Sequence, residues 1–295
     1  MSELAASGPL VGALPLRRRR GVRRYLAAAI CIAICTVIVL PLLASVLASI
    51  KTPEEAAAIP PTFIPHALSF SSYERLWHFQ AGLLTYAGNS LVAALLTIAF
   101  CLALTIPAGY ALACFPLPAK EALFLLLLLG LIIPYQALLT PLFFMFVKLG
   151  LGNSLIGLAI VHTAIQLPFS VYVMRNAFEA VPRELGEAAV MDGANSWQVL
   201  TRVMLPAIVP AIITVALFAF ITSWNEFLAA LVMMNRDSSF TLPLILSASR
   251  QQTSLGGTDW GMLQAGITVS IIPCMAFYLL LQKYYVAGFT TGAVK

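Results

Sequence analysis

The chain has 295 residues, of which 60% are hydrophobic and 10% are charged, and its net charge is +5. About a quarter of the residues of a soluble domain are charged, so this chain has too few charged groups to cover a water-facing surface. The composition excludes an ordinary soluble protein and predicts a membrane protein with lipid as much of its solvent.

A basic block precedes the first apolar run. It reads Arg17-Arg18-Arg19-Arg20-Gly21-Val22-Arg23-Arg24, and its position is typical of a topology determinant or a lipid-headgroup contact. Nucleic acid is the weaker interpretation of this charge, and no nucleic-acid partner is expected. The apolar run from Tyr25 to Ile50 exceeds the roughly 7–15 residues of a signal-peptide core, which predicts a retained first membrane helix.

Six stretches reach the length of about 20 apolar residues that a membrane-spanning helix needs. They are roughly 26–50, 86–113, 122–141, 154–175, 207–230 and 262–284. They lack two-residue alternation, which favours helices over a membrane barrel. The third contains Pro134 and Pro141, so we expect a kink and a short second helix around Leu142–Leu149. The predicted fold class is an all-α, polytopic membrane protein with six transmembrane helices.

The basic residues predict the orientation of these helices. With the N-terminus in the cytoplasm, 12 of the 17 basic residues lie inside and 5 outside, as the positive-inside rule favours. Both termini are then cytoplasmic. The expected organisation is a basic cytoplasmic tail over 1–25, a six-helix transmembrane domain over 26–285 with a cytoplasmic loop at 181–206, and a cytoplasmic tail over 286–295.

The cytoplasmic loop between the fourth and fifth stretches is predicted to form two short helices. Pro182 suits the first position of one helix, and Gly193 suits its C-terminal cap. Asn195 or Ser196 can cap the second, which Pro206 is expected to end. One apolar face of the second helix is expected from residues at helical spacing: Trp197, Leu200, Val203 and Met204. From its residues alone, this loop is either an ordinary connection packed under the membrane helices or a docking surface.

A family resemblance rests on this loop. The spacing of Glu187-Ala188-Ala189, Gly193 and Leu205-Pro206 resembles the EAA loop of ABC importer permeases. With Asp192-Gly193-Ala194 and Pro210, it is similar to the carbohydrate-uptake branch, of the type of the maltose importer's smaller permease. The likeness extends from about Leu26 to Lys295, and supporting phrases occur at Ser49–Glu55, Asn89-Ser90, Trp224–Phe227 and Tyr285–Lys295.

The resemblance implies a non-catalytic permease subunit in the bacterial cytoplasmic (inner) membrane. It implies a coupling surface for an ATPase, formed by Glu187, Ala188, Ala189, Asp192, Gly193, Leu205 and Pro206. The implied partners are a second permease subunit that is expected to differ from this chain, two ATPase subunits and an extracytoplasmic solute-binding protein. The sequence lacks a P-loop, so we expect no cofactor on this chain and ATP-Mg on the ATPase subunits. The three histidines have no metal-ligand spacing, and no metal is expected.

Polar residues inside the spans are candidates for the solute pathway. Glu226, near the outer end of the fifth span, is either an interfacial carboxylate that reaches water or lines the outer pathway together with Asn225. Gln166 is a weaker candidate, because helix–helix hydrogen bonds explain it equally well. The sugar substrate is implied by the resemblance alone. The alternatives are an ABC permease for a non-sugar solute or an ion-coupled secondary transporter, which would be expected to show internal repeats and a buried relay.

Overall fold

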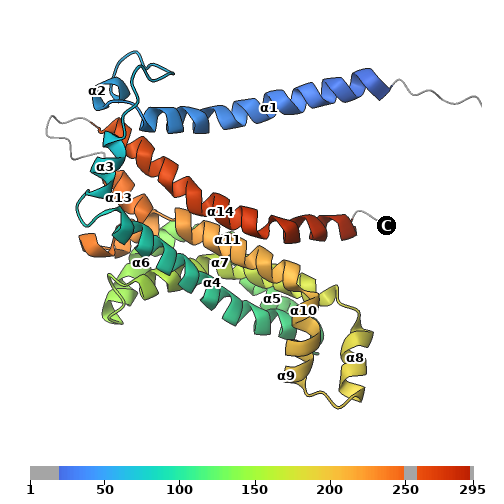
Figure 1. Cartoon of the computed structure of the whole chain (residues 1–295). Coiled ribbons are helices and arrows are strands. Elements are labelled where there is room, and N and C mark those ends of the chain that lie inside the picture. Colours follow the sequence, from blue (N-terminus) through green and yellow to red (C-terminus); the bar gives the residue numbers. More distant parts are fainter. Residues whose placement is uncertain (1–19, 249–257, 293–295) are drawn as a thin grey trace, which may run out of the picture. The chain divides into compact units, whose positions relative to one another are not determined.

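The structure is a computed structural model that describes residues 20–248 and 258–292. Within these ranges every regular element is a helix, which confirms the all-α class. The chain divides into two compact units, Met1–Ala44 and Ser45–Lys295, and the second holds the helix bundle (Figure 1). Most of the predicted basic tail lies outside the described residues.

The first helix, α1 (Arg20–Ser49), matches the predicted first span. Its segment Arg24–Ser49 has a mean hydropathy of 2.9, and none of its most apolar window is buried. It is built from Ala, Ile, Leu and Val, and Pro41 lies inside it without ending it. A helix that is apolar on all sides and unburied suits a lipid environment, so a retained membrane helix fits this segment.

Fewer helices than predicted can cross a membrane alone. In the described residues, four are long and apolar enough: Arg24–Ser49 in α1, α4 (Leu83–Cys114), α7 (Leu155–Glu179) and Trp260–Gln282 in α14 (Trp260–Gly292). A fifth candidate joins Ser196–Ala207 to α11 (Val209–Asn225) through a bend of 78°. α14 continues to Gly292, so no helix end marks the predicted boundary between residues 285 and 286.

The third predicted span is divided into two helices. α5 (Lys120–Leu129) and α6 (Tyr135–Lys148) are separated by residues 130–134, so the break ends at Pro134, one of the two prolines expected to interrupt this span. Pro134 is the N-cap of α6, where a missing N–H has no helical partner to lose. Pro141 lies inside α6, and the expected start of a second helix at Leu142 is wrong: that helix already begins at Tyr135.

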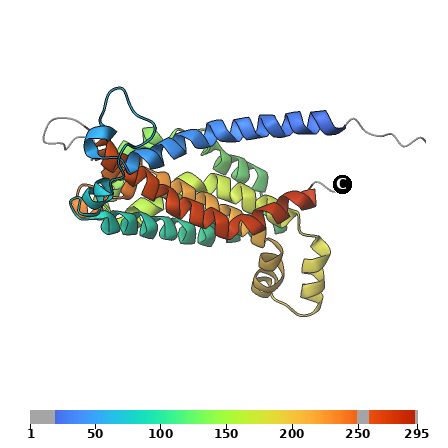
Figure 2. The same ribbon diagram turned by 45° about the horizontal axis from the view of Figure 1, so that its top comes forward.

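The core of the second unit consists of α4, α7, α11 and α14. α4 packs along α7, and α11 packs against both and against α14 (Figures 1 and 2). α4 and α7 approach closely at Gly109, where an added Cβ would lie 2.6 Å from the Cβ of Met174. Glycine permits this contact because it has no side chain.

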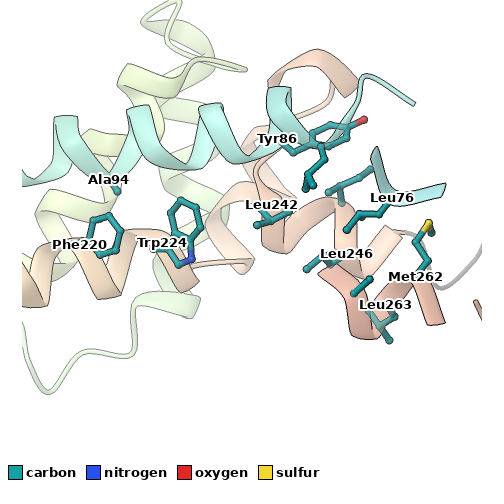
Figure 3. Close-up of a cluster of buried hydrophobic side chains, with 12 residues drawn as sticks. Leu76, Tyr86, Ala94, Phe220, Trp224, Leu242, Leu246, Met262 and Leu263 are labelled. Carbon is teal, nitrogen blue, oxygen red and sulfur yellow. The ribbon is translucent and has the colours of Figure 1, made fainter. Parts of the chain in front are cut away.

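An aromatic cluster fixes α11 within this core (Figure 3). The rings of Phe220 and Trp224 stack with centroids 5.7 Å apart, and Phe277 of α14 stacks on Phe220 at 4.3 Å. The indole N–H of Trp224 donates to the carbonyl oxygen of Ser270 at 3.1 Å. Leu242 packs in the same cluster. The C-terminal half of α11 is therefore held in one orientation, which positions the residues that follow it.

Short helices lie at the two ends of the bundle. α3 (Ser71–Trp77) and α13 (Leu242–Ala248) lie at one end, and α8 (Arg183–Met191) and α9 (Ser196–Gln198) lie at the other (Figure 1). The remaining short elements are α2 (Pro53–Ala56), the π-helix η1 (Val199–Met204), α10 (Leu205–Ala207), α12 (Leu228–Met233) and the 3-10 helix η2 (Asp237–Ser239).

Candidate functional site

The first candidate site is the coupling loop, the segment from α8 to α10. α8 begins directly after Pro182, which is the N-cap rather than the expected first helical residue. Gly193 follows the helix with a φ of +85°. Its N–H donates to Val190 O at 3.0 Å, and the N–H of Ala194 donates to Ala189 O at 2.9 Å. These two bonds form a Schellman motif, so the predicted glycine cap is confirmed.

The second arm of the coupling loop starts with a capping box. The Asn195 side-chain oxygen accepts from Gln198 N at 2.9 Å, and the Gln198 side-chain oxygen accepts from Asn195 N at 2.9 Å. Of the two expected caps, Asn195 is the one used. Pro206 does not end this arm, which continues to Ala207. Pro206 is the second residue of α10, which follows η1 directly, and the arm ends one residue after it.

The buried face of this arm differs from the expected one. Val199, Leu200 and Met204 are buried in a core cluster with Cys101, Met174 and Phe178, but Trp197 is 70% exposed. The π-helical turn over η1 has more residues per turn than an α-helix, so α-helical spacing gave the wrong position for Trp197. α8 lies against this arm at Gly186, where an added Cβ would be 3.1 Å from the terminal carbon of Met204.

Most of the predicted coupling residues are accessible. Glu187, Ala188, Asp192, Gly193 and Pro206 are exposed, whereas Ala189 and Leu205 are half-buried. Sequence reasoning missed two exposed apolar side chains of α8 beside them, Val190 at 59% and Met191 at 86%. Grouped exposed apolar side chains mark interaction surfaces. They could have been predicted from the sequence of α8, a short helix that carries both acidic and apolar residues.

A cavity of about 1040 Å³ lies between α8 and the ends of the membrane helices. Tyr110 and Cys114 of α4, Phe178 of α7, and Arg183 and Glu187 of α8 are among its lining residues. α8 therefore rests on the bundle only along part of its length. Nothing in the sequence pattern predicts this cavity, because it depends on how three separate helices end.

An ion-pair cluster lies at the root of the coupling loop. Arg175 of α7 donates to Glu121 of α5 at 2.6 and 3.0 Å and to Glu179 at 2.8 Å. Its guanidinium carbon lies 4.2 Å from the centre of the Phe124 ring. The hydrogen bonds from Arg175 lower the pKa of the Glu121 carboxyl. This cluster fixes the start of α5 next to the end of α7.

The second candidate site is a buried polar network around Glu226. This carboxylate is 8% exposed. It accepts from the backbone N–H groups of Ala229 at 2.8 Å and Ala230 at 3.2 Å, and thereby caps α12. It also pairs with Nε2 of His162 and with the Tyr135 hydroxyl, each at 3.3 Å. The interpretation of Glu226 as a carboxylate that reaches water is wrong, because four donors surround it in the protein interior.

The network continues from His162 across three helices. Nδ1 of His162 lies 2.7 Å from the hydroxyl of Ser223 in α11, which lies 3.3 Å from that of Thr97 in α4. One turn along α7, the side-chain oxygen of Gln166 accepts from Thr222 at 3.0 Å. The buried side-chain nitrogen of Gln166 has no hydrogen-bond partner in the described part of the chain.

Asn225 does not join this network. Its side chain is exposed, and its amide donates to the carbonyl oxygen of Ile221 at 2.9 Å. The three predicted pathway residues are therefore not brought to one surface, since Gln166 and Glu226 are buried. Sequence reasoning missed the contacts of Glu226 with His162 and Tyr135 and that of His162 with Ser223. The spacing of four between His162, Gln166 and Ser170 could have indicated one polar face of α7.

The two sites offer hydrogen bonds, ion pairs and apolar contacts, and neither presents an accessible catalytic group. No group of three or more metal-binding side chains occurs within residues 20–248 and 258–292. Ser223, His162 and Glu226 follow one another as a nucleophile, a base and an acid would, but all three are buried among packed helices. The coupling loop offers a surface for a partner, and the Glu226 network offers a hydrogen-bonded joint between helices.

Comparison with known proteins gives consistent matches. Residues 105–290 match the family described as binding-protein-dependent transport system inner membrane component. The osmoprotective compounds uptake permease protein of Synechocystis sp. is 36% identical over 208 residues, which are 70% of this chain and 69% of that protein. The arabinooligosaccharides transport system permease protein of Halalkalibacterium halodurans is 32% identical over 79% of this chain and 82% of its own.

Solved structures show the same fold. One chain of a bacterial ABC transporter involved in the import of the acidic polysaccharide alginate matches with a TM-score of 0.79 and 24% identity. The match covers 92% of this chain and 100% of that chain. The arrangement of helices described above is therefore that of an ABC importer permease.

Proposed function

The chain belongs to the family of binding-protein-dependent transport system inner membrane components, and we propose that it forms half of the translocation pathway of an ATP-driven importer for a sugar or sugar-like solute. As the membrane component of such a system, it is a non-catalytic subunit. The proposed partners are a second permease subunit, two ATPase subunits that bind ATP-Mg, and an extracytoplasmic solute-binding protein. The proposed location is the bacterial cytoplasmic membrane.

The exposed coupling loop carries this proposal. It extends from one end of the bundle (Figure 1) and combines acidic and apolar exposed side chains on α8. The Schellman motif and the capping box fix the angle between its two arms, and the buried residues of η1 join it to α4 and α7. A surface of this kind can receive a force from a partner and pass it to the membrane helices.

The arrangement of α5 and α6 supports the proposal that the chain crosses the membrane six times. The start of α5 is tied to the end of α7 through the pair of Glu121 and Arg175. After α6, Asn153 accepts from the N–H groups of Asn235 and Arg236 beyond α12, at the opposite end of α7. Together, α5 and α6 therefore run from one end of α7 to the other, and we propose that they form a broken third span. Together with the distribution of basic residues, six crossings support the proposal that both termini lie in the cytoplasm.

The substrate class rests on the relatives. An arabinooligosaccharide permease and an alginate importer suggest a carbohydrate, whereas the relative for osmoprotective compounds leaves a non-sugar solute as the alternative. Asn225 is the proposed pathway residue with an exposed polar side chain. Glu226 and Gln166 would act on the pathway by positioning α11 and α12, because both are buried.

Uptake of labelled oligosaccharides into vesicles tests this function. The chain would be assembled with its proposed partner subunits, with ATP enclosed on the cytoplasmic side. We expect uptake that requires ATP and that continues when ionophores collapse the ion gradients. Uptake that stops with the ion gradient would instead identify a secondary transporter, and uptake of other solutes alone would remove the sugar assignment.

A further inference from the structure

The segment after α1 folds into a closed loop. Residues 51–69 leave the end of α1, form α2, and return so that the N–H of Ser69 donates to the carbonyl oxygen of Ile50 at 2.8 Å. Thr52 caps α2 through its side chain. The two ends of this loop, which we call the α1 loop, are therefore joined directly where the apolar part of α1 ends.

Two charged side chains of the α1 loop, Lys51 and Glu55, face its interior, whereas Glu54 and the ring of His66 are exposed. Lys51 is only 4% exposed and donates to the carbonyl and, at 3.0 Å, to the hydroxyl oxygen of Thr62. The Thr62 hydroxyl in turn donates to Glu55 at 2.8 Å. The backbone N–H of His66 also donates to Glu55, at 3.1 and 3.2 Å, and Nδ1 of its ring lies 2.9 Å from the same carboxylate. The charges of Lys51 and Glu55 are therefore used to hold the loop closed.

The apolar side chains point outward. No Asp, Glu, Lys or Arg occurs between Glu55 and Glu74. The exposed large side chains there are Ile59 at 96%, Phe63 and Ile64 at 76%, Leu68 at 71% and Phe70 at 68%. A loop in water has the opposite arrangement, because exposed apolar surface is unfavourable at about 25 cal/mol per Å². The arrangement fits a loop whose surroundings are apolar.

The position of the loop identifies these surroundings. The segment Arg24–Ser49 has 26 residues, and at 1.5 Å per residue it is about 39 Å long, more than the roughly 30 Å of hydrocarbon in a bilayer. Its Ser49 end therefore reaches the membrane surface, two residues before the loop begins. Uncharged aromatic and aliphatic side chains suit this boundary, whereas a transient protein partner is met by a surface with a polar rim.

We propose that the apolar face of the α1 loop, formed by Ile59, Phe63, Ile64 and Leu68 with the adjoining Phe70, inserts into the lipid interface and anchors the Ser49 end of α1. The inner network of Lys51, Thr62 and Glu55 holds the loop in the shape that exposes this face. This role requires neither a particular solute nor the coupling loop.

Photo-crosslinking tests the proposal in the membranes of cells that make the full chain. Phe63 would be replaced by p-benzoyl-phenylalanine, and the irradiated products would be separated by mass. We expect products with phospholipid acyl chains. The control is the same replacement at Trp197, which is 70% exposed on the coupling loop and should give no lipid product. Products of Phe63 with a protein subunit, or no product, would overturn the proposal.

A second measurement avoids the bulky probe. Phe63→Trp in nanodiscs should add fluorescence that brominated lipids quench, whereas Met191→Trp should add fluorescence that they do not quench. Combining Glu55→Gln with Phe63→Trp should remove most of this lipid quenching, because the loop loses its closing hydrogen bonds. The matched control is Glu54→Gln, at an exposed neighbour, which should preserve it. Quenching of the Phe63→Trp variant by aqueous acrylamide alone would show a loop in water and overturn the proposal.

Discussion

The coupling loop and the Glu226 network both contain acidic side chains, but the two regions hold them in opposite ways. In the coupling loop, backbone caps fix the chain, and Glu187 and Asp192 remain exposed. In the network, the backbone depends on a side chain, because Glu226 caps α12 and joins it to α7. Exposed acids in the first region are therefore free to serve a partner, whereas the buried acid in the second maintains the fold.

The largest expected effect separates these two kinds of acid. Glu226→Ala leaves the N–H groups of Ala229 and Ala230 and Nε2 of His162 without the carboxylate that they contact. Breaking a buried pair in this way should destabilise the protein by about 3–5 kcal/mol. Glu187→Ala should change stability by less than about 0.5 kcal/mol. Thermal unfolding in detergent measures both, and equal melting temperatures would contradict the comparison.

A smaller effect is expected where α4 meets α7. Gly109→Ala would place a Cβ 2.6 Å from that of Met174 and 3.0 Å from the backbone nitrogen of Arg175, which should destabilise the protein by about 1–3 kcal/mol through overpacking. Gly88→Ala in the same helix is the control, because nothing lies within 4 Å of its added Cβ. The control should be neutral or slightly stabilising. Chemical denaturation of the two variants would show the difference.

The glycine turn tests whether the caps of the coupling loop serve transport. Gly193 has a φ of +85° and open space around it, so strain and not crowding limits substitution there. Gly193→Val should strain the turn by about 1–2 kcal/mol and uncouple ATP hydrolysis from uptake. Asparagine adopts this conformation more readily, so Gly193→Asn should retain most coupling. A valine variant that assembles and transports at the full ATP-dependent rate would refute the proposed role.

The smallest expected effect is a loss of stability at acidic pH, when the Glu121 carboxyl becomes protonated. Arg175 lowers the pKa of Glu121 in the folded protein, so the pair stabilises the fold above the unfolded pKa of the carboxyl. This contribution is lost as the pH falls through the lower, folded value. Glu121→Gln should therefore reduce stability slightly at neutral pH and make no difference in strong acid. Melting temperatures from neutral to acidic pH provide the measurement. A variant with unchanged stability at every pH would show that the exposed pair contributes nothing.

The same contrast explains how much the sequence predicts. Gly193 and Asn195 act on backbone groups within five residues, so local spacing predicted both caps. Apolar runs predicted the helices of α1, α4, α7 and α14. The break between α5 and α6, the burial of Glu226 and the exposure of Trp197 depend on contacts with distant segments or on a π-helical turn, and local spacing contains no measure of these. The coupling role of the loop and the pathway role of Asn225 remain predictions.

The bend of 78° before α11 has a mechanical consequence. Residues 196–207 and α11 form the two limbs of an elbow, and Ile208 lies at its corner, buried against the core. A force along residues 196–207 acts at a steep angle to the axis of α11. It would therefore rotate α11 about Ile208. Phe220 and Trp224 are stacked in the far half of that helix. Such a turn would reach the opposite side of the bundle as a sideways swing, with α11 as the lever.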